Sequence, residues 1–291
     1  MPTLDTFLST PWLLYPTVTI VSLCIGSFLN VVILRLPKMM QQEWRCQCEE
    51  FLEVPEGDRT KDSTITLSSP ASTCPSCGHK IRPWENVPVI SWLMLGGKCA
   101  SCKSPISARY PVIEALTALV SVATVALLGP SEAALWALLL IWSLVALTVI
   151  DFDTQLLPDN MTLPLMWLGL VLNYFGVLTD FASAFWGAVA GYLSLWSVYW
   201  LFKLVTGKEG MGHGDFKLLA ALGAWLGWQL LPAVILISSL VGAIVGISLM
   251  VFRKHGREVP IPFGPYLAVA GVVCLWFGGE IQTFWFGFLG V

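Results

Sequence analysis

The chain has 291 residues, of which 56% are hydrophobic and only 12% are charged, and its mean hydropathy is +0.73. A soluble globular domain carries roughly 25% charged residues, so this composition excludes an ordinary soluble protein and predicts a lipid bilayer as the solvent. The net charge of -3 excludes the strongly basic surface of a nucleic-acid-binding protein.

Eight apolar segments predict membrane-spanning helices, because each approaches the roughly 20 residues that cross a hydrocarbon core. In chain order they are 13–34, 110–128, 133–150, 161–178, 182–202, 216–231, 233–252 and 266–286, of which the sixth is short. The first lacks the basic n-region and small-residue cleavage site of a signal peptide. The expected fold is therefore an all-α polytopic membrane protein with about eight transmembrane helices.

The basic residues predict the orientation of these helices. All 16 lysines and arginines fall within or at the borders of four segments, which are 35–109, 151–160, 203–217 and 253–262. The loops on the opposite side, such as 129–132 and 179–180, contain none. Cytosolic loops carry the excess of Lys and Arg, so we expect these four segments in the cytosol and both termini on the other side.

Segment 35–109 is a polar insert between the first two apolar segments. The expected division is a first span at 1–34, a cytosolic insert at 35–109 and a seven-span membrane domain at 110–291. The interior of the insert, 49–73, is too polar to bury a core of its own. A bound metal can supply the missing folding free energy, because the ligands of the folded state bind it directly.

Two CxxC pairs in the insert supply metal-ligand chemistry, and they consist of Cys74, Cys77, Cys99 and Cys102. Each pair places two thiolates on one side of a tetrahedron, and the spacing between the pairs is typical of a zinc ribbon or knuckle. Four thiolates leave no open position, which favours structural over catalytic zinc. The alternatives are disulfides, which rarely persist in the cytosol, and plain reduced thiols.

The remaining candidate metal ligands are weaker. His79 follows Cys77 closely and is either a substitute ligand or a solvated side chain. Cys46 and Cys48 form a Cys-x-Cys that we interpret as a bystander to the metal site. Cys24 and Cys274 lie in apolar segments, where a free cysteine packs as a small hydrophobic residue.

Two aspartates interrupt the apolar segments at the same cytosolic depth. Asp151 ends the third segment, and Asp215 begins the sixth after Gly212 and Gly214. Helix packing can bring the two together, and two close carboxylates share a proton, so that one acts as base toward water and the other as acid toward a carbonyl. The positive end of a helix dipole favours ionised Asp215. We therefore expect Asp215 as the initial base and Asp151 as the initial acid of an aspartic protease.

The alternative is that both aspartates only mark the ends of interfacial loops. Asp153 and Asp159 are internal comparisons, because neither has the glycine context of Asp215. Asp153 is expected to face solvent, and Asp159 follows a proline in the way that a turn and helix N-cap do.

Several segments together resemble one family. They are the two CxxC pairs, Asp151 with 157–159, the GxGD of 212–215, and the segments 26–37, 82–88, 107–114 and 262–266. With these segments the chain resembles, over essentially its whole length, the bacterial type IV prepilin peptidases, which are bifunctional leader peptidases and N-methyltransferases of the inner membrane. GxGD also occurs in presenilin-like intramembrane proteases, but those lack the cysteine insert.

The resemblance implies that Asp151 and Asp215 are the catalytic pair. It implies cleavage of the short basic leader of prepilins and pseudopilins at the cytosolic membrane face, after a glycine and before a phenylalanine. It also implies methylation of the new amino group by S-adenosylmethionine, since the four cysteines are typical of the bifunctional branch. The implied location is the inner membrane, with both termini periplasmic, and the implied systems are type IV pili and type II secretion.

The methyl-donor site has no clear signature, because no Gly-rich loop after a strand resembles a Rossmann nucleotide site. The candidate residues are Glu85, Asn86, Gly96, Gly97 and Glu114. The alternative roles are a turn before the second cysteine pair for Gly96 and Gly97, and a solvated loop for Glu85 and Asn86. For Glu114 the alternative is an interfacial carboxylate with its hydrogen bonds satisfied.

Two other function classes compete with the enzyme. A secondary transporter can use Asp151 and Asp215 as a proton relay, but it predicts inverted repeats and midplane sites, and the sequence shows no internal repeat. A non-enzymatic adaptor can bind a partner through its zinc insert, but this leaves the GxGD segment unexplained.

Overall fold

The computed structural model describes residues 6–55, 65–253 and 262–289. Within these ranges the regular elements are helices, and pairing between extended segments is limited to two isolated β-bridges in the insert. Six described helices are long and apolar enough to cross a membrane, which confirms an all-α, multi-span membrane protein. The chain forms two compact units, Met1–Ala126 and Leu127–Val291, which are called the N-terminal and C-terminal units below.

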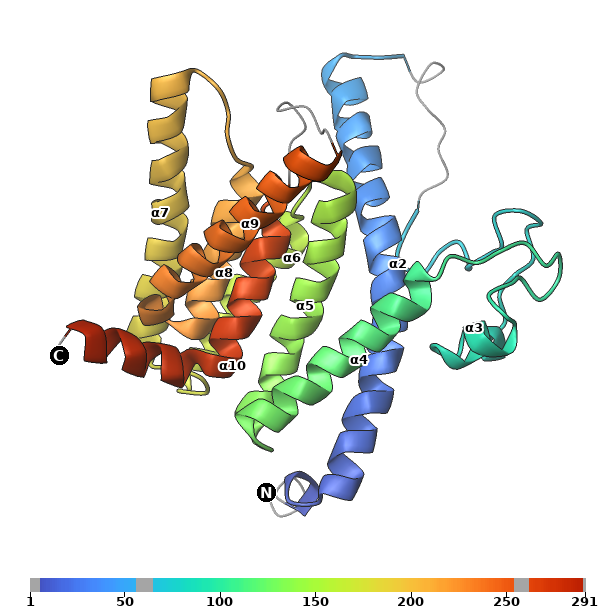
Figure 1. The fold of residues 1–291 in the computed structure, drawn as a ribbon. Helices are drawn as coiled ribbons and strands as arrows, with labels where there is room; N and C mark the ends of the chain where they lie inside the picture. Colours follow the sequence, from blue (N-terminus) through green and yellow to red (C-terminus); the bar gives the residue numbers. More distant parts are fainter. Residues whose placement is uncertain (1–5, 56–64, 254–261, 290–291) are drawn as a thin grey trace. The chain divides into compact units, whose positions relative to one another are not determined.

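The N-terminal unit is organised by two long helices and carries the cysteine insert between them (Figure 1). Its elements are α2 (Pro11–Phe51), the short 3-10 helix η1 (Pro83–Asn86), α3 (Ile90–Met94) and α4 (Arg109–Leu128). Helix α2 has 41 residues, so it extends about 60 Å, roughly twice the thickness of a hydrocarbon core. The start of the predicted insert therefore continues this helix, because its Lys, Gln, Glu and Met residues are good helix formers.

Helices α2 and α4 pack closely through small and polar residues. A Cβ atom on Gly26 would lie 2.8 Å from Cα of Glu114, so only a glycine allows the two backbones to approach this closely. One turn further along α2, the buried Asn30 donates from Nδ2 to the carbonyl oxygen of Tyr110 (3.2 Å). These contacts set the register of the two helices.

The C-terminal unit contains six helices and one 3-10 turn, which are α5 (Glu132–Thr154), α6 (Asp159–Tyr174), α7 (Phe181–Thr206), α8 (His213–Leu226), η2 (Trp228–Leu230), α9 (Leu231–Arg253) and α10 (Gly264–Leu289). Figure 1 shows α8 among the other helices of this unit. From Asp215 to Leu226, every residue of α8 except Lys217 is buried. A helix with only 14 residues is typical of a buried core element rather than of a full span.

All eight expected apolar segments form helices, but they differ in length. Six reach spanning length, whereas α6 and α8 have 16 and 14 residues. Most of the predicted basic segment at 253–262 lies outside the described residues. Helix α10 is interrupted at Phe277, where φ is -118° and ψ is 23°, and its two halves run in different directions (Figure 1).

The core of the C-terminal unit is held by close helix crossings. Gly187 of α7 and Gly223 of α8 meet so closely that a Cβ atom on either would collide with the carbonyl oxygen of the other. The indole of the buried Trp225 donates to the carbonyl oxygen of Leu165 (2.8 Å). The amide of Asn173 donates to the carbonyl oxygen of Ala224 (2.8 Å). Helix α8 is therefore fixed in depth and rotation, which positions the residues at its N-terminus.

Candidate active site and metal centre

Asp151 lies in the last turn of α5 and is only 5% exposed. Its Oδ2 atom accepts a hydrogen bond from the backbone N–H of Gly264 (2.9 Å), the first residue of α10. The first amides of a helix have no partner within the helix, and the positive end of the helix dipole lies there. The N-terminus of α10 therefore binds the Asp151 carboxyl group, although 113 positions separate the two residues.

Gly264 leaves no room for a side chain beside this hydrogen bond. A Cβ atom would lie 2.6 Å from Oδ2 of Asp151 and 3.2 Å from Cδ1 of Leu157. The same Leu157 side chain packs against Gly214, where a Cβ atom would lie 2.7 Å from Cβ of Leu157. Leu157 therefore brings the start of α10 and the GxGD segment to one place.

Asp215 lies in the first turn of α8 and is 7% exposed. Its backbone N–H donates to the carbonyl oxygen of Gly212 (3.2 Å). Its Oδ1 atom has no hydrogen-bond partner within the described ranges. The side chain lies close enough to Asp151 for the two carboxylates to repel each other. A buried carboxylate oxygen without a partner is costly, so this atom is available to a water or a substrate.

The two comparison aspartates have different surroundings. Asp153 is exposed. Both carboxylate oxygens of Asp159 accept from Nζ of Lys217 at 2.6 Å, which ties α6 to α8. The N-cap of α6 is Pro158, and Asp159 is the first helical residue. The expected capping role of Asp159 is therefore wrong, because its side chain pairs with lysine instead of capping the helix.

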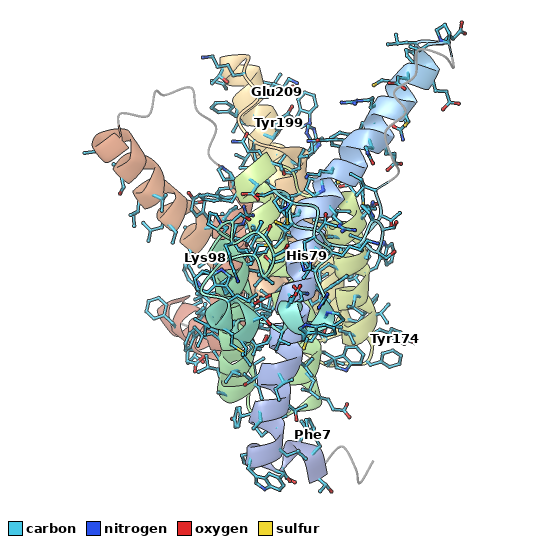
Figure 2. The ribbon with its side chains drawn as sticks, turned by 90° about the vertical axis from the view of Figure 1, so that its right-hand side faces the viewer. Phe7, His79, Lys98, Tyr174, Tyr199 and Glu209 are labelled. Carbon is cyan, nitrogen blue, oxygen red and sulfur yellow. The ribbon has the colours of Figure 1, made fainter. Side chains whose placement is uncertain are left out.

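The loop that leads into the GxGD segment is anchored by α7. Nζ of Lys203 donates to Glu209 (2.8 Å) and to the hydroxyl of Tyr199 (3.3 Å), and Figure 2 shows Tyr199 and Glu209 near each other. The Tyr199 ring also lies 5.0 Å from the His213 ring and 5.7 Å from the Phe216 ring, measured between centroids. This aromatic cluster was not predicted, because single aromatic residues in apolar segments carry no distinguishing pattern.

A groove of about 370 Å³ lies in the C-terminal unit. Its lining is mostly apolar and comes from α7, α9, α10 and the residues just before Gly212 and Gly264, and it consists of Leu195, Val198, Met211, Ile235, Ser239, Gly242, Ala243, Phe263 and Tyr266. Met211 directly precedes Gly212, and Phe263 directly precedes Gly264. Two lining residues of the groove are therefore sequence neighbours of the GxGD segment and of the N-terminus of α10.

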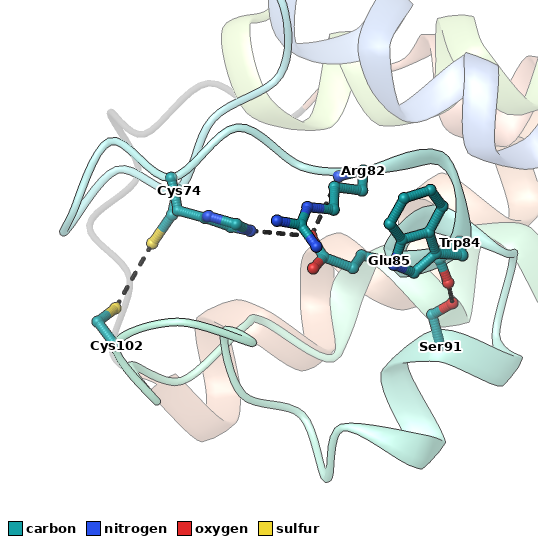
Figure 3. A network of polar contacts seen from close by, with 7 residues as sticks. Cys74, Arg82, Trp84, Glu85, Ser91 and Cys102 are labelled. Carbon is teal, nitrogen blue, oxygen red and sulfur yellow. Dashed lines mark hydrogen bonds and ion pairs between the residues drawn. The ribbon is translucent and has the colours of Figure 1, made fainter.

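The four predicted cysteines form one cluster in the N-terminal unit. Their Sγ atoms all lie within 4.8 Å of one another, and those of Cys74 and Cys102 are 3.8 Å apart (Figure 3). A Zn–S bond of about 2.3 Å gives a sulfur–sulfur edge of about 3.8 Å in a tetrahedron. The cluster therefore has the size of a four-thiolate metal site, and it can bind a metal.

The two CxxC turns have the same backbone structure. Each first cysteine donates its N–H to the carbonyl oxygen five residues later, from Cys74 to His79 and from Cys99 to Ser104. The fourth residue after each first cysteine has a positive φ, 70° at Gly78 and 60° at Lys103. This repeated turn aims both thiols of each pair at one centre.

The electrostatics of the cluster favour a bound cation. A hydrogen bond with Ser104 is the main reason that the pKa of Cys74 falls to about 6, and the same hydroxyl lowers the pKa of Cys102. A backbone hydrogen bond from His79 lowers the pKa of Cys77, but burial and the neighbouring thiols outweigh it and raise that pKa to about 11. Ionisation is therefore easier at Cys74 and Cys102 than at Cys77, and thiolates are the form that binds metal.

His79 is neither a ligand nor a free solvated side chain. Its Nε2 atom lies 3.0 Å from Oε2 of Glu85. Glu85 also accepts from the backbone N–H of Arg82 (3.1 Å). This backbone bond and then the His79 bond hold the pKa of Glu85 below its usual range. Glu85 therefore serves to close the η1 turn beside the metal cluster.

Of the other residues predicted to bind the methyl donor, two make contacts within the protein and two are exposed. Gly97 has a φ of 68°, and its Cβ position would lie 2.9 Å from the Trp92 ring. Glu114 is buried and accepts from the backbone N–H of Val89 (2.7 Å). Asn86 and Gly96 are exposed. Three of the five candidates thus have internal structural contacts.

Cys46 and Cys48 are exposed on α2 and lie outside the four-thiol cluster.

Comparison with known proteins covers nearly the whole chain. Residues 20–128 match the bacterial peptidase A24 N-terminal domain, and residues 138–247 match the type IV leader peptidase family. A prepilin leader peptidase/N-methyltransferase of Aeromonas hydrophila is 55% identical over 95% of this chain and 94% of its own length. Proteins with the same name from Pseudomonas aeruginosa and Burkholderia pseudomallei are 53% and 48% identical, over 100% and 89% of this chain and 99% and 84% of their own lengths. No solved structure matches the chain.

Proposed function

Because the chain belongs to the type IV leader peptidase family, we propose that it cleaves the short basic leader from prepilins and pseudopilins and then methylates the new amino group. The observation that carries this proposal is the 55% identity, over 95% of the chain, to a relative named for both activities. The two buried aspartates of the C-terminal unit supply a site for the first activity. The transporter and adaptor alternatives have no comparable support.

In the proposed cleavage, Asp215 is the initial base and Asp151 the initial acid. Oδ1 of Asp215, which has no partner within the described ranges, accepts a proton from water as the water oxygen attacks the scissile carbonyl carbon. Oδ2 of Asp151 accepts from Gly264, which leaves its Oδ1 to carry the proton that passes to the carbonyl oxygen. The proton on Asp215 then passes to the leaving nitrogen as the C–N bond breaks, and Asp151 takes a proton back from the gem-diol, which leaves a carboxylic acid and restores the pair.

The groove in the C-terminal unit fits the part of a prepilin that follows the cleavage site. That part is an apolar helix led by phenylalanine, and it must extend from the aspartates into the bilayer. The groove is lined mostly by apolar side chains of α7, α9 and α10, and its lining includes Met211 and Phe263, which directly precede Gly212 and Gly264. We therefore assign the groove to the apolar segment of the substrate.

The insert, residues 35–109, is proposed to lie in the cytosol, with both termini periplasmic and seven spans in 110–291. Its four cysteines would hold zinc, which supplies folding free energy to a polar segment. Four thiolates would occupy all four coordination positions of the zinc, so we assign the zinc a structural role.

S-adenosylmethionine is the proposed methyl donor. Glu85, Gly97 and Glu114 already make contacts within the protein. Asn86 and Gly96 are exposed, so among the five predicted residues we give these two priority.

The first prediction concerns the aspartates. Asp151→Asn and Asp215→Asn should each reduce leader cleavage by on the order of 10⁴-fold, and the double variant should lose little more, because the two carboxyl groups act as a unit. Asp153→Asn and Asp159→Asn serve as controls and should keep most activity. Cleavage of a prepilin in proteoliposomes measures this, and activity retained in either dyad variant would contradict the assignment.

The second prediction concerns Gly264. Gly264→Ala should lower kcat by about 100-fold, because a displacement of the Asp151 carboxyl group by 1 Å has a cost of this size. Gly279→Ala, in the same helix but with no atom within 4 Å of its Cβ position, is the matched control. Unchanged kcat in Gly264→Ala would show that the N-terminus of α10 does not set the site.

The third prediction concerns the groove. Ala243→Trp should lower kcat/KM for a full prepilin by about 10- to 200-fold, the range for a lost apolar pocket contact. A short peptide with the leader and cleavage site but no apolar helix should be cleaved as before. Leu240→Trp, on the exposed side of α9, is the control. Equal loss on both substrates would argue against the assignment of the groove.

The fourth prediction concerns the metal. Elemental analysis of the purified chain should find about one zinc per chain. Cys102→Ser should lose it and make the insert sensitive to protease, whereas Cys46→Ser and Cys48→Ser should change neither property. A metal-free preparation with a protease-resistant insert is the result that this account cannot accommodate.

The fifth prediction concerns the methyl donor. Asn86→Ala should lower the methylated fraction of mature pilin by about tenfold, the cost of one hydrogen bond to a bound donor, while cleavage continues. The control is Ser101→Ala, another exposed insert residue. Mass spectrometry of the pilin N-terminus measures both products, and full methylation would move the donor site elsewhere.

A further inference from the structure

The segment 87–94 of the insert lies beside α4 rather than beyond its end. The backbone N–H of Val89 donates to Oε2 of Glu114 (2.7 Å), and α4 begins five residues before Glu114, at Arg109. At 1.5 Å per residue, Val89 therefore lies about 8 Å along α4 from Arg109.

Helix α2 shows independently how far along the helix pair Val89 lies. Gly26 is level with Glu114, because a Cβ atom on Gly26 would lie 2.8 Å from Cα of Glu114. Gly26 precedes Arg35 by nine residues (35 minus 26), which is about 14 Å along the helix. The guanidinium of Arg35 donates to backbone oxygens of the polar part of the insert, at Thr66, Leu67 and Pro70. Val89 thus lies further along both helices from the polar part of the insert than Arg35 and Arg109 do, at the level of the apolar part of α2.

Polar groups at this depth are satisfied within the protein. The Ser91 hydroxyl donates to the carbonyl oxygen of Trp84 (2.8 Å) and accepts from the backbone N–H of Val87 (3.0 Å). The Trp92 indole donates to the carbonyl oxygen of Ile106 (3.1 Å). Irregular backbone is tolerated within the hydrocarbon region only where its hydrogen bonds are made internally. A solvated cytosolic loop does not need these bonds.

Val89 itself is held in an unfavourable conformation. Its φ is 60°, which is a genuine outlier for a β-branched residue. Such strain persists only where the surrounding structure over-determines it, and here the buried Glu114 carboxyl group holds the amide. This bond fixes the start of α3 against α4.

The outward face of the segment is apolar. Ile90, Leu93 and Met94 are 55%, 64% and 83% exposed. Trp84 is also exposed, and the Arg82 guanidinium lies 5.5 Å from its ring centroid. An apolar helical face with an aromatic and a basic residue at its edge is typical of a segment that lies in a membrane interface.

We propose that α3 and its flanking residues 87–89 enter the leaflet on the side of the basic segments, and that lipid acyl chains cover Ile90, Leu93 and Met94. The insert is then attached to the membrane at a third place besides α2 and α4. Its four-thiol cluster is held at the bilayer surface instead of projecting freely into the aqueous phase.

The test uses the full chain in nanodiscs, with an environment-sensitive fluorescent amino acid in place of Met94. Met94 is largely exposed, so the substitution leaves the packing intact, and the matched control places the same probe at Ser101, which is exposed next to the cysteine cluster. We expect lipids brominated near the headgroup end of the chain to quench the Met94 probe, and aqueous iodide to quench only the Ser101 probe.

Two results would overturn the proposal. Quenching of the Met94 probe by iodide but not by brominated lipid would show that α3 lies in water. Protection of the Met94 probe from both quenchers would show that another part of the protein or a second chain covers α3. Both readouts are independent of peptidase and methyltransferase activity.

Discussion

The candidate active site depends on one hydrogen bond, from the backbone N–H of Gly264 to the carboxyl group of Asp151. A carboxyl group at the buried end of an apolar helix is costly without a partner, and α10 supplies that partner with the unpaired amide at its N-terminus. The contact requires a residue without a side chain, because a Cβ atom would collide with the carboxyl group that the amide binds. Leu157 then links this place to the GxGD segment, so that Asp151 and Asp215 belong to one site.

Each of the two units holds polar side chains in a protein that is otherwise apolar, and each does so by a different structural means. In the C-terminal unit, a short helix too small to span is buried among its neighbours, and its N-terminus carries Asp215 at the depth of Asp151. In the N-terminal unit, a polar insert that cannot form a core gathers four thiols around a metal-sized centre. The Glu114 carboxyl group ties the segment between the two cysteine pairs to α4.

Apolar run length and cysteine spacing were sufficient to predict the helices and the thiol cluster, because both are properties of neighbouring residues. The positions of Asp151 and Asp215 at helix ends were also predicted, because each residue lies at the end of an apolar segment. Gly264 was not singled out for a role, because its contribution is a backbone amide with no side-chain chemistry to recognise. The partner of Glu114 could not be predicted, because the backbone N–H of Val89 lies 25 positions away in the sequence. Helix α8 is shorter than a span, and the other helices of the C-terminal unit bury nearly all of it, which apolar run length alone does not reveal.

The most direct test is a solid-state NMR measurement of the dipolar coupling between a ¹³Cγ label on Asp151 and a ¹⁵N label on Gly264, in the native chain in lipid bilayers. The account predicts a resolved coupling of a directly hydrogen-bonded pair, and its loss in Gly264→Ala but not in Gly279→Ala. A native chain in which the two nuclei show no coupling would contradict the claim that the N-terminus of α10 holds the aspartate in place.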